Sequence, residues 1–344
     1  MAAEARVWTL GQIASLVDGK LHGPSDQPVS RPVPAGWDEP SGITFAEDEA
    51  NLSKAQGSSV GAVLIGPGMV LGDRPHIVVS SPRAAFFRVL GAFETQPFLE
   101  SGVHPTAVVA PEATVEPGAS VGAFAVIEAQ AVVESGARVF AHCYVGQGSR
   151  IGARSVLMPG VVLYPNVVIG SDCLLHSGVV LGCDGFGFFW DGSRQMKIPH
   201  AGHLRVGDMC EIGANTCIDR ATCGESIVGE GVKLDNLVHI GHNARIGAHT
   251  VMAGQVGVSG SVTLGERCVI GGQSGITDHV TVAGGTRVGG MSGVSNDVPD
   301  AKELFGIPAR PLAESMRSLA ALRKLPELFK RVMALESQIK RTQD

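Results

Sequence analysis

A period of six residues governs the middle of the chain. Every sixth residue is apolar over residues 103–181, 206–218 and 228–294, at 29 positions without a polar exception, although only 44% of the 344 residues are hydrophobic. Neither the 3.6-residue period of an α-helix nor the two-residue alternation of a strand produces this pattern. The period predicts short parallel strands wound into coils of three segments, with one apolar side chain of each segment directed into a narrow axis.

Each coil depends on its neighbours. Three buried aliphatic side chains stabilise a coil by less than the conformational entropy that ordering its backbone costs, so the coils must stack and share hydrogen bonds. Three segments per coil predict about ten coils. Glycine often follows the apolar residue, for example at Gly122, Gly213 and Gly241, and we expect these glycines to supply the permissive backbone angles of a corner.

The first part of the chain, residues 1–100, lacks the period. Apolar spacing predicts a helix over residues 8–17 and another over residues 82–93, where proline occupies the first turn. The apolar runs 60–65 and 76–79 are typical of buried strands. We therefore expect a small N-terminal α/β domain.

The period also stops before the C-terminus. The sequence GIPARP at residues 306–311 interrupts the coil, and apolar residues then recur at spacings of three and four. This pattern predicts an amphipathic helical tail, kinked at Pro326, that packs against symmetry mates. The chain is thus divided into an N-terminal domain over residues 1–100, a coiled β domain over residues 101–308 and a helical extension over residues 309–344.

Composition narrows the possible functions. The net charge of −6 argues against a general nucleic-acid-binding surface. The longest weakly charged stretch, residues 156–170, contains Pro159 and Pro165 and makes a poor membrane span. Seven cysteines without a CxxC pair favour free thiols over a disulfide framework or a zinc knuckle. We expect a soluble cytoplasmic protein without an integral membrane segment.

Two segments interrupt the period, residues 182–203 and residues 219–226. The first holds three of the 12 Phe and one of the 3 Trp in the chain, which is more than a closing turn requires. Departures from a regular repeat often serve function. We expect the functional site to lie beside these two segments.

The sequence DNLVHIGHN at residues 235–243 follows the second interruption and places His242 at a corner. Gly260 stands one coil further along, so its N–H lies about 4.8 Å from that corner along the stack. A base beside a bare N–H donor suits acyl transfer to an amine, because the imidazole takes the amine proton and the N–H stabilises the oxyanion. His279, two coils and one residue beyond His242, lines the same side.

The period resembles that of the hexapeptide-repeat acyltransferases. This resemblance implies a mainly β fold, a left-handed parallel β-helix, although the general crossover rule favours the right hand. It also implies a homotrimer with active sites between neighbouring prisms. Longer motifs resemble the UDP-3-O-acylglucosamine N-acyltransferases of lipid A biosynthesis, and they are GCDGFG (182–187), KIP (197–199), EIGANTCIDR (211–220), DNLVHIGHN (235–243) and GGQSGI (271–276). Residues 9–23 and 43–45 are similar to that family's uridine-binding domain, and the tail is similar to its C-terminal extension.

The resemblance implies transfer of a 3-hydroxyacyl chain from the 4′-phosphopantetheine thioester of acyl carrier protein to the 2-amino group of UDP-3-O-(3-hydroxyacyl)glucosamine, with no metal or other cofactor. His242 matches the family's general base, His279 its second active-site histidine, and Gly260 its backbone donor near the pantetheine arm. Phe45 matches the uracil-stacking position. The remaining matched substrate-binding positions are Asp48, Asn51, Asp184, Phe186, His200, Asp235, Asn236 and Asn243.

Three positions depart from the family's pattern. Asp48 and Asn51 stand where relatives often carry Asn and Tyr, so one face for uracil stacking is missing. Asn296 stands where relatives commonly carry a basic residue. Docking of the carrier protein must then rely more on other basic residues, such as Arg310, Arg317, Arg323 or Lys324.

Three alternative functions use parts of the same pattern. An acetyl-CoA-dependent N-acyltransferase acting on another nucleotide amino-sugar also needs the repeat and a corner histidine, but the coil count, the tail and the aromatic insertion disfavour it. A zinc enzyme resembling the γ-class carbonic anhydrases would use His239 and His242, but residues three apart on coiled strands do not share a face. A non-catalytic β-solenoid scaffold would need neither the aromatic insertion nor the N-terminal domain.

Overall fold

The computed structural model describes residues 7–95 and 97–343 of the chain, and side chains up to residue 336. Internal contacts divide the chain into two compact units, Met1–Phe98 and Leu99–Asp344. Each unit is described by itself.

The first unit is a small α/β domain. Its five-stranded sheet has the order β2 (Lys20–His22), β7 (His76–Val78), β6 (Ala62–Ile65), β5 (Gly42–Ala46) and β4 (Arg31–Pro32), while β1 (Trp8–Thr9) pairs with β3 (Pro28–Val29). Its helices are α1 (Leu10–Leu16), α2 (Glu49–Gln56) and α3 (Pro82–Phe93). The structure confirms the helices expected near residues 8–17 and 82–93 and the strands expected within 60–65 and 76–79. Helix α2 was not expected.

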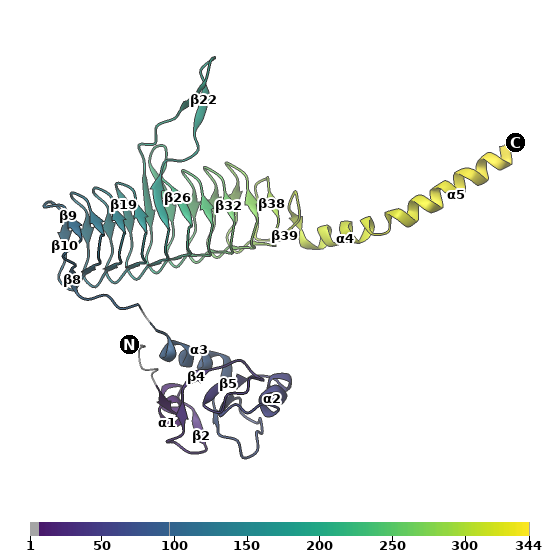
Figure 1. Cartoon of the computed structure of the whole chain (residues 1–344). Helices are drawn as coiled ribbons and strands as arrows, with labels where there is room; N and C mark the ends of the chain where they lie inside the picture. Colours follow the sequence, from purple (N-terminus) through teal and green to yellow (C-terminus); the bar gives the residue numbers. More distant parts are fainter. Residues whose placement is uncertain (1–6, 96, 344) are drawn as a thin grey trace. The chain divides into compact units, whose positions relative to one another are not determined.

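Three sheets wind around one axis in the second unit (Figure 1). The ten-stranded sheet contains β9 (Val108–Val109), β12 (Val126–Ile127), β15 (Tyr144–Val145), β18 (Val162–Leu163), β21 (Val180–Cys183), β26 (Cys217–Asp219), β29 (His239–Ile240), β32 (Gly257–Val258), β35 (Gly275–Ile276) and β38 (Gly293–Val294). The nine-stranded sheet contains β10 (Thr114–Val115), β13 (Val132–Val133), β16 (Arg150–Ile151), β19 (Val167–Ile169), β24 (His203–Val206), β27 (Glu225–Val228), β30 (Arg245–Ile246), β33 (Thr263–Leu264) and β36 (Thr281–Val282).

The third sheet has twelve strands and closes the prism. It contains β8 (Gly102–Val103), β11 (Ser120–Val121), β14 (Arg138–Val139), β17 (Val156–Leu157), β20 (Leu174–Leu175), β25 (Glu211–Ile212), β28 (Lys233–Leu234), β31 (Val251–Met252), β34 (Val269–Ile270), β37 (Arg287–Val288), β39 (Glu303–Phe305) and β40 (Arg310–Pro311). All pairs in the three sheets are parallel except β39 with β40. The predicted fold class, a left-handed parallel β-helix with a small α/β domain and a helical tail, is confirmed.

The apolar residues of the period form the core along the axis. Of the 29 positions, 26 are buried, and the exceptions are Val103, Val109 and Val115. These three belong to the first strands of their sheets, β8, β9 and β10, which have a neighbouring coil on one side only. The period therefore predicted the core correctly everywhere except at the open end of the stack.

The expected role of the glycines after the apolar residues is wrong. Gly213 and Gly241 do not have a positive φ; instead, a Cβ on Gly241 would lie 2.8 Å from the backbone nitrogen of Gly260 in the next coil. These glycines are needed because adjacent coils approach closely there. The left-handed angles fall three residues after the apolar position, for example at Asn243 and His279, both with a φ of 59°.

The two interruptions of the period have different structures. Residues 182–203 include a hairpin, β22 (Phe188–Trp190) paired with β23 (Gln195–Lys197), which projects from the coil in Figure 1. Residues 219–226 form a bulge between β26 and β27. Beyond the last coil, helices α4 (Leu312–Leu322) and α5 (Leu325–Gln343) form the tail, which breaks just before Pro326. Neither of these helices, nor any other helix in the described part of the chain, is long and apolar enough to cross a membrane.

Candidate active site

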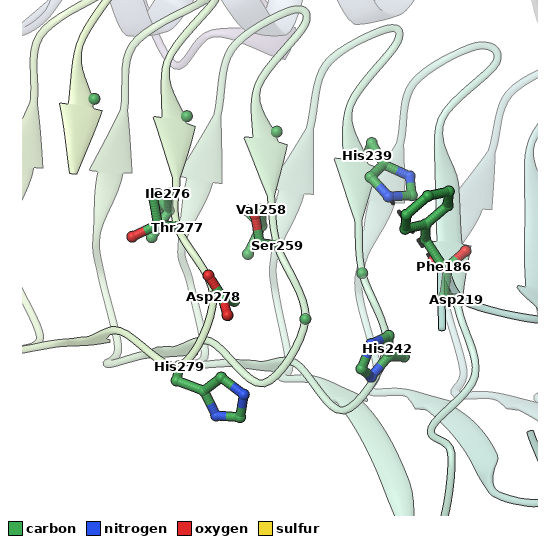
Figure 2. A pocket seen from close by; sticks show the side chains of 15 residues that line it. Phe186, Asp219, His239, His242, Val258, Ser259, Ile276, Thr277, Asp278 and His279 are labelled. Atoms are coloured by element: carbon green, nitrogen blue, oxygen red, sulfur yellow. Dashed lines mark ion pairs between the residues drawn. The ribbon is translucent and has the colours of Figure 1, made fainter. Parts of the chain in front are cut away.

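A groove of about 660 Å³ runs along the outer face of the ten-stranded sheet, over strands β26 to β38 (Figure 2). It lies on the C-terminal side of the hairpin, and Phe186 from the base of the hairpin forms part of its wall. The other lining residues are Asp219, His239, Gly241, His242, Gly257, Val258, Ser259, Gly260, Gly275, Ile276, Thr277, Asp278, His279 and Gly293. The groove thus contains three of the residues for which the sequence predicted a catalytic role.

The floor of the groove is a row of glycines. His239, Gly257, Gly275 and Gly293 are register partners on four successive strands and occupy the same outward position. A Cβ on Gly257 or Gly275 would meet no atom within 4 Å. Because the outward positions of Gly257 and Gly275 are open, the glycine floor leaves a channel about 10 Å long beside His239, and the side chain of Ile307, 3.5 Å from a Cβ on Gly293, lies at its far end. This floor was not predicted from the sequence, although steps of 18 residues from His239 reach each of its glycines.

His242 is oriented by its neighbour Asn243. Its Nδ1 lies 3.0 Å from Oδ1 of Asn243. That oxygen also accepts hydrogen bonds from the backbone N–H of Thr222 (3.0 Å) and from its hydroxyl (2.6 Å), so the amide cannot be flipped. An amide oxygen only accepts, and His242 therefore carries its proton on Nδ1. Its Nε2 presents a lone pair, as a general base requires.

The second interruption supplies the support for Asn243. Besides the two bonds from Thr222, the Asn243 side-chain NH₂ donates to the carbonyl of Cys223 (3.0 Å), and the Asn243 backbone N–H donates to the hydroxyl of Ser226 (2.8 Å). The bulge over residues 219–226 thus holds Asn243 through its side-chain oxygen, its side-chain NH₂ and its backbone N–H. Asn243, predicted as a substrate-binding residue, lies where it fixes the orientation of His242.

Gly260 lies directly beside the base. A Cβ at this position would be 2.7 Å from Nε2 of His242, and the N–H of Ser261 donates to the His242 carbonyl (2.8 Å). The Gly260 N–H donates no hydrogen bond to any residue that the structure describes. The stacking that the 18-residue step predicted is therefore present, and the residue that lies against Nε2 has a free N–H.

His279 and Asp278 form the next coil of the same edge. The backbone N–H of His279 donates to the carbonyl of Gly260 (3.2 Å). Figure 2 shows the rings of His242 and His279 along one edge of the groove, on different coils. Asp278 also lines the groove, and sequence analysis did not single it out.

A buried carboxylate lies at the head of the groove. The Asp219 side chain is 6% exposed; it accepts a hydrogen bond from the thiol of Cys183 (3.1 Å) and lies 3.8 Å from Nε2 of His239. Burial raises the pKa of Asp219 above its ordinary value. The hydrogen bond from Cys183 and the charges of His239, His242 and His200 offset only part of this increase. Burial and the bond to Asp219 raise the pKa of Cys183 to about 12, which keeps this thiol protonated. The sequence placed Asp219 in an interruption without assigning it a role.

The base of the hairpin packs on the histidines. His200 is 8% exposed, its ring lies 5.3 Å from that of His242 at a steep angle, and its Nδ1 donates to the carbonyl of Ile198 (2.9 Å). Asp184 pairs with Lys197, and this hydrogen bond lowers the pKa of Asp184. Phe186 is 88% exposed. His200 and Phe186 thus border the site, while Asp184 secures the hairpin.

Other predicted residues lie elsewhere. Asp235 and Asn236 line a different groove, at the corner between the twelve-stranded and ten-stranded sheets, and Asn236 Oδ1 accepts the N–H of Ala214 (2.7 Å). Within one chain they do not line the groove of His242.

The predicted uridine-binding residues all lie in the first unit. Phe45 is half-buried on β5, with its ring 4.8 Å from that of Phe86. Asp48 caps helix α2 by accepting the backbone N–H of Asn51 (2.7 Å). This carboxylate is therefore already engaged in holding the start of a helix.

The ring nitrogens of His239 and His242 lie against different groups. The Nε2 of His239 lies near Asp219, whereas the Nε2 of His242 lies against Gly260. Across the described part of the chain, no three side chains of His, Cys, Asp or Glu are grouped so that they could hold a metal ion.

The fold and the groove define an acyltransferase of the hexapeptide-repeat class. A family model described as bacterial transferase hexapeptide (six repeats) matches residues 148–183. The structure is similar to a solved Arabidopsis UDP-N-acetylglucosamine acyltransferase, with a TM-score of 0.56 and 26% identity, covering 63% of this chain and 76% of that one.

Sequence relatives define the family more narrowly. The UDP-3-O-acylglucosamine N-acyltransferase 1 of Gloeobacter violaceus is 42% identical over 334 residues, and the UDP-3-O-acylglucosamine N-acyltransferase of Syntrophotalea carbinolica is 46% identical over 331 residues; each match covers 96% of both chains. The chain belongs to the UDP-3-O-acylglucosamine N-acyltransferase family and is an enzyme of the transferase class.

Proposed function

We propose that this enzyme transfers a 3-hydroxyacyl chain from acyl carrier protein to the 2-amino group of UDP-3-O-(3-hydroxyacyl)glucosamine in lipid A biosynthesis. The observation that carries the proposal is the position of Gly260 against His242 inside the groove: a Cβ on Gly260 would lie 2.7 Å from Nε2 of His242, and the Gly260 N–H donates no hydrogen bond to any described residue. The names of the relatives support the sugar substrate. The thioester on the 4′-phosphopantetheine arm of the carrier protein is the co-substrate.

The reaction proceeds by direct attack. Nε2 of His242 accepts a proton from the amine as the amine nitrogen forms a bond to the thioester carbonyl carbon. The Gly260 N–H stabilises the oxyanion that develops on the carbonyl oxygen. Collapse of the tetrahedral intermediate breaks the C–S bond, and the protonated His242 returns the proton to the sulfur. The products are an amide and the free pantetheine thiol, without a covalent acyl-enzyme.

The glycine floor receives the unbranched part of the donor. Gly257 and Gly275 leave a channel that begins beside His239 and ends at Gly293, where Ile307 lies, so an extended chain can lie along it. His279 borders the same channel. As the second histidine of the site, it helps to hold the thioester carbonyl in place.

The proposal also includes recognition of the uridine nucleotide and association of copies of the chain. We assign uridine recognition to the first unit, with Phe45 as the stacking residue. The helical tail exposes the apolar side chains Leu319, Leu322, Leu328, Phe329 and Val332, which supports association of three copies through α4 and α5. We also propose that the enzyme acts as a homotrimer in the cytoplasm and that Asp235 and Asn236, which line a second groove of the chain, bind substrate.

A donor-and-variant assay tests this function. Purified enzyme is supplied with UDP-3-O-acylglucosamine and either 3-hydroxyacyl carrier protein or the matching acyl-CoA. We expect the carrier-bound donor to give the higher kcat/KM, and His242→Ala to abolish N-acylation while His104→Ala, in the first coil, remains active. Equal kcat/KM with acyl-CoA would favour the acetyl-CoA-type alternative. Comparable turnover by His242→Ala would refute the assignment of the base.

A further inference from the structure

The buried carboxylate of Asp219 accepts too few strong hydrogen bonds to offset the free-energy cost of burying its charge. Its side chain is 6% exposed, and within the described residues its one hydrogen-bond donor is the thiol of Cys183. A thiol is a weak donor, and a buried carboxylate that lacks strong donors is costly. A charge kept in such a position needs positive partners.

The groups that face Asp219 come from four elements. His239 lies on β29, with its Nε2 3.8 Å from the carboxylate. Asp219 and His242 follow the register partners Ile218 and Ile240 on β26 and β29, and both line the groove. His200, at the return of the hairpin, has its ring 5.3 Å from that of His242. The charges of His242 and His200 lower the pKa of Asp219. The other titratable neighbours are the thiols of Cys183 on β21 and Cys217 on β26. Every positive charge available to Asp219 from these groups is a protonated histidine.

We propose that Asp219 is a positioning residue that stabilises the positive charge which His242 acquires when it takes the proton of the amine. This proposal rests on the proposed function. Asp219 does not itself bind the proton, which stays on His242 until it returns to the leaving sulfur.

The physical reason lies in the difference between two states of the site. A general base acts in its neutral form, so the reactive form of His242, with its Nδ1–H held by Asn243 and its Nε2 free, offers Asp219 no charge. In the transition state His242 becomes an imidazolium. The negative charge of Asp219 then attracts this positive charge through the protein interior, where the effective dielectric constant is lower than in water. An interaction that is stronger in the transition state than in the ground state raises kcat.

Histidine NMR tests the charge effect without relying on activity. The full-length protein is labelled with ¹³C-histidine, the His242 signal is assigned by its loss in His242→Ala, and its titration midpoint is measured. We expect Asp219→Asn to lower this midpoint by about half a pH unit or more, Asp219→Glu to restore it, and Asp172→Asn, an exposed acid that pairs with Arg154, to leave it unchanged.

A second variant covers a failure of Asp219→Asn to fold. Cys183→Ala removes the hydrogen bond that lowers the pKa of Asp219 and so favours the uncharged acid, which should lower the His242 midpoint in the same direction as Asp219→Asn. An unchanged midpoint in folded Asp219→Asn, or a midpoint that does not fall in folded Cys183→Ala, would overturn the proposal.

Kinetics then connect the charge to catalysis. In Asp219→Asn the acidic limb of kcat/KM against pH should move to lower pH, and its plateau should fall about tenfold or more. An equal loss at every pH, with an unshifted limb, would indicate a structural role and contradict the proposal. If the wild-type enzyme does not acylate UDP-3-O-acylglucosamine but the His242 midpoint still shifts, the proposed function fails while the charge effect of Asp219 is supported.

Discussion

Replacing Gly260 by alanine is the sharpest test of the base and donor pair. The new Cβ would lie 2.7 Å from Nε2 and 2.8 Å from Cε1 of His242. Gly260 does not have a positive φ, so alanine adds a steric conflict without straining the backbone. The conflict must be relieved by the His242 ring, which is only half-buried and can rotate toward the groove.

The size of the effect follows from the required movement. Ordinary contact between the two atoms needs about 0.7 Å more than the available distance. A displacement approaching 1 Å at a reacting atom costs about 100-fold in rate, or about 2.7 kcal/mol. We therefore expect kcat to fall about 100-fold or more, with little change in the free energy of unfolding because no core contact is lost.

The assay compares two alanines in the same coil. Steady-state kcat and KM are measured for Gly260→Ala and Gly257→Ala, together with the thermal midpoint of each. A Cβ on Gly257 meets no atom within 4 Å, so its effect should fall on KM for the donor and leave kcat close to that of the wild type. A folded Gly260→Ala enzyme with wild-type kcat would refute the reasoning, because the base would then act elsewhere than against Gly260.

Three further predictions concern the surroundings of this pair. Gly275→Leu should block the glycine floor and raise KM for the donor at least about tenfold, as measured by initial rates over a donor series; unchanged KM would exclude the floor as the donor channel. Thr222→Val should remove one hydrogen bond that holds Asn243, lowering kcat several-fold with KM and thermal midpoint nearly constant. The bond from Lys197 lowers the pKa of Asp184, so this contribution to hairpin stability is complete above the unfolded value of about 3.9 and is lost as pH falls through the folded value. Tryptophan fluorescence should report loosening of the hairpin in acid, and Asp184→Asn should abolish that transition.

The period predicted the β-helix because it records one physical requirement at every coil. An inward residue has no alternative to being apolar, so 26 buried positions could be identified by counting alone. Helix α2 was missed since its sequence, EANLSKAQ, has only Leu52 as a large apolar residue and no apolar stripe. The feature of its sequence that indicates a helix is the N-cap residue Asp48, which accepts the N–H of Asn51. An N-cap residue that is not followed by an apolar helix face is weak evidence for a helix.

The candidate site was predicted only where it follows the coil spacing. His242 and Gly260 could be paired because both lie at corners one coil apart. Asp219 and Cys183 could not, since their hydrogen bond joins residues 36 apart across an insertion that changes the step between coils. The glycine corners show the same limit: sequence indicates that glycine is needed, but only the distance from Gly241 to the next coil shows that the cause is close approach rather than a positive φ.

The position of the site beside both interruptions has a physical cause. In a regular coil, an outward side chain stands on a flat face, where only its neighbours along the stack can hold it. His242 instead has Asn243 fixed by Thr222 and Cys223 of the bulge, and His200 of the insertion against its ring. A general base must keep one tautomer and one direction, and a uniform repeat supplies too few contacts to impose either. The extra residues that break the period are therefore the structural requirement for turning a repeated corner into a single reactive one.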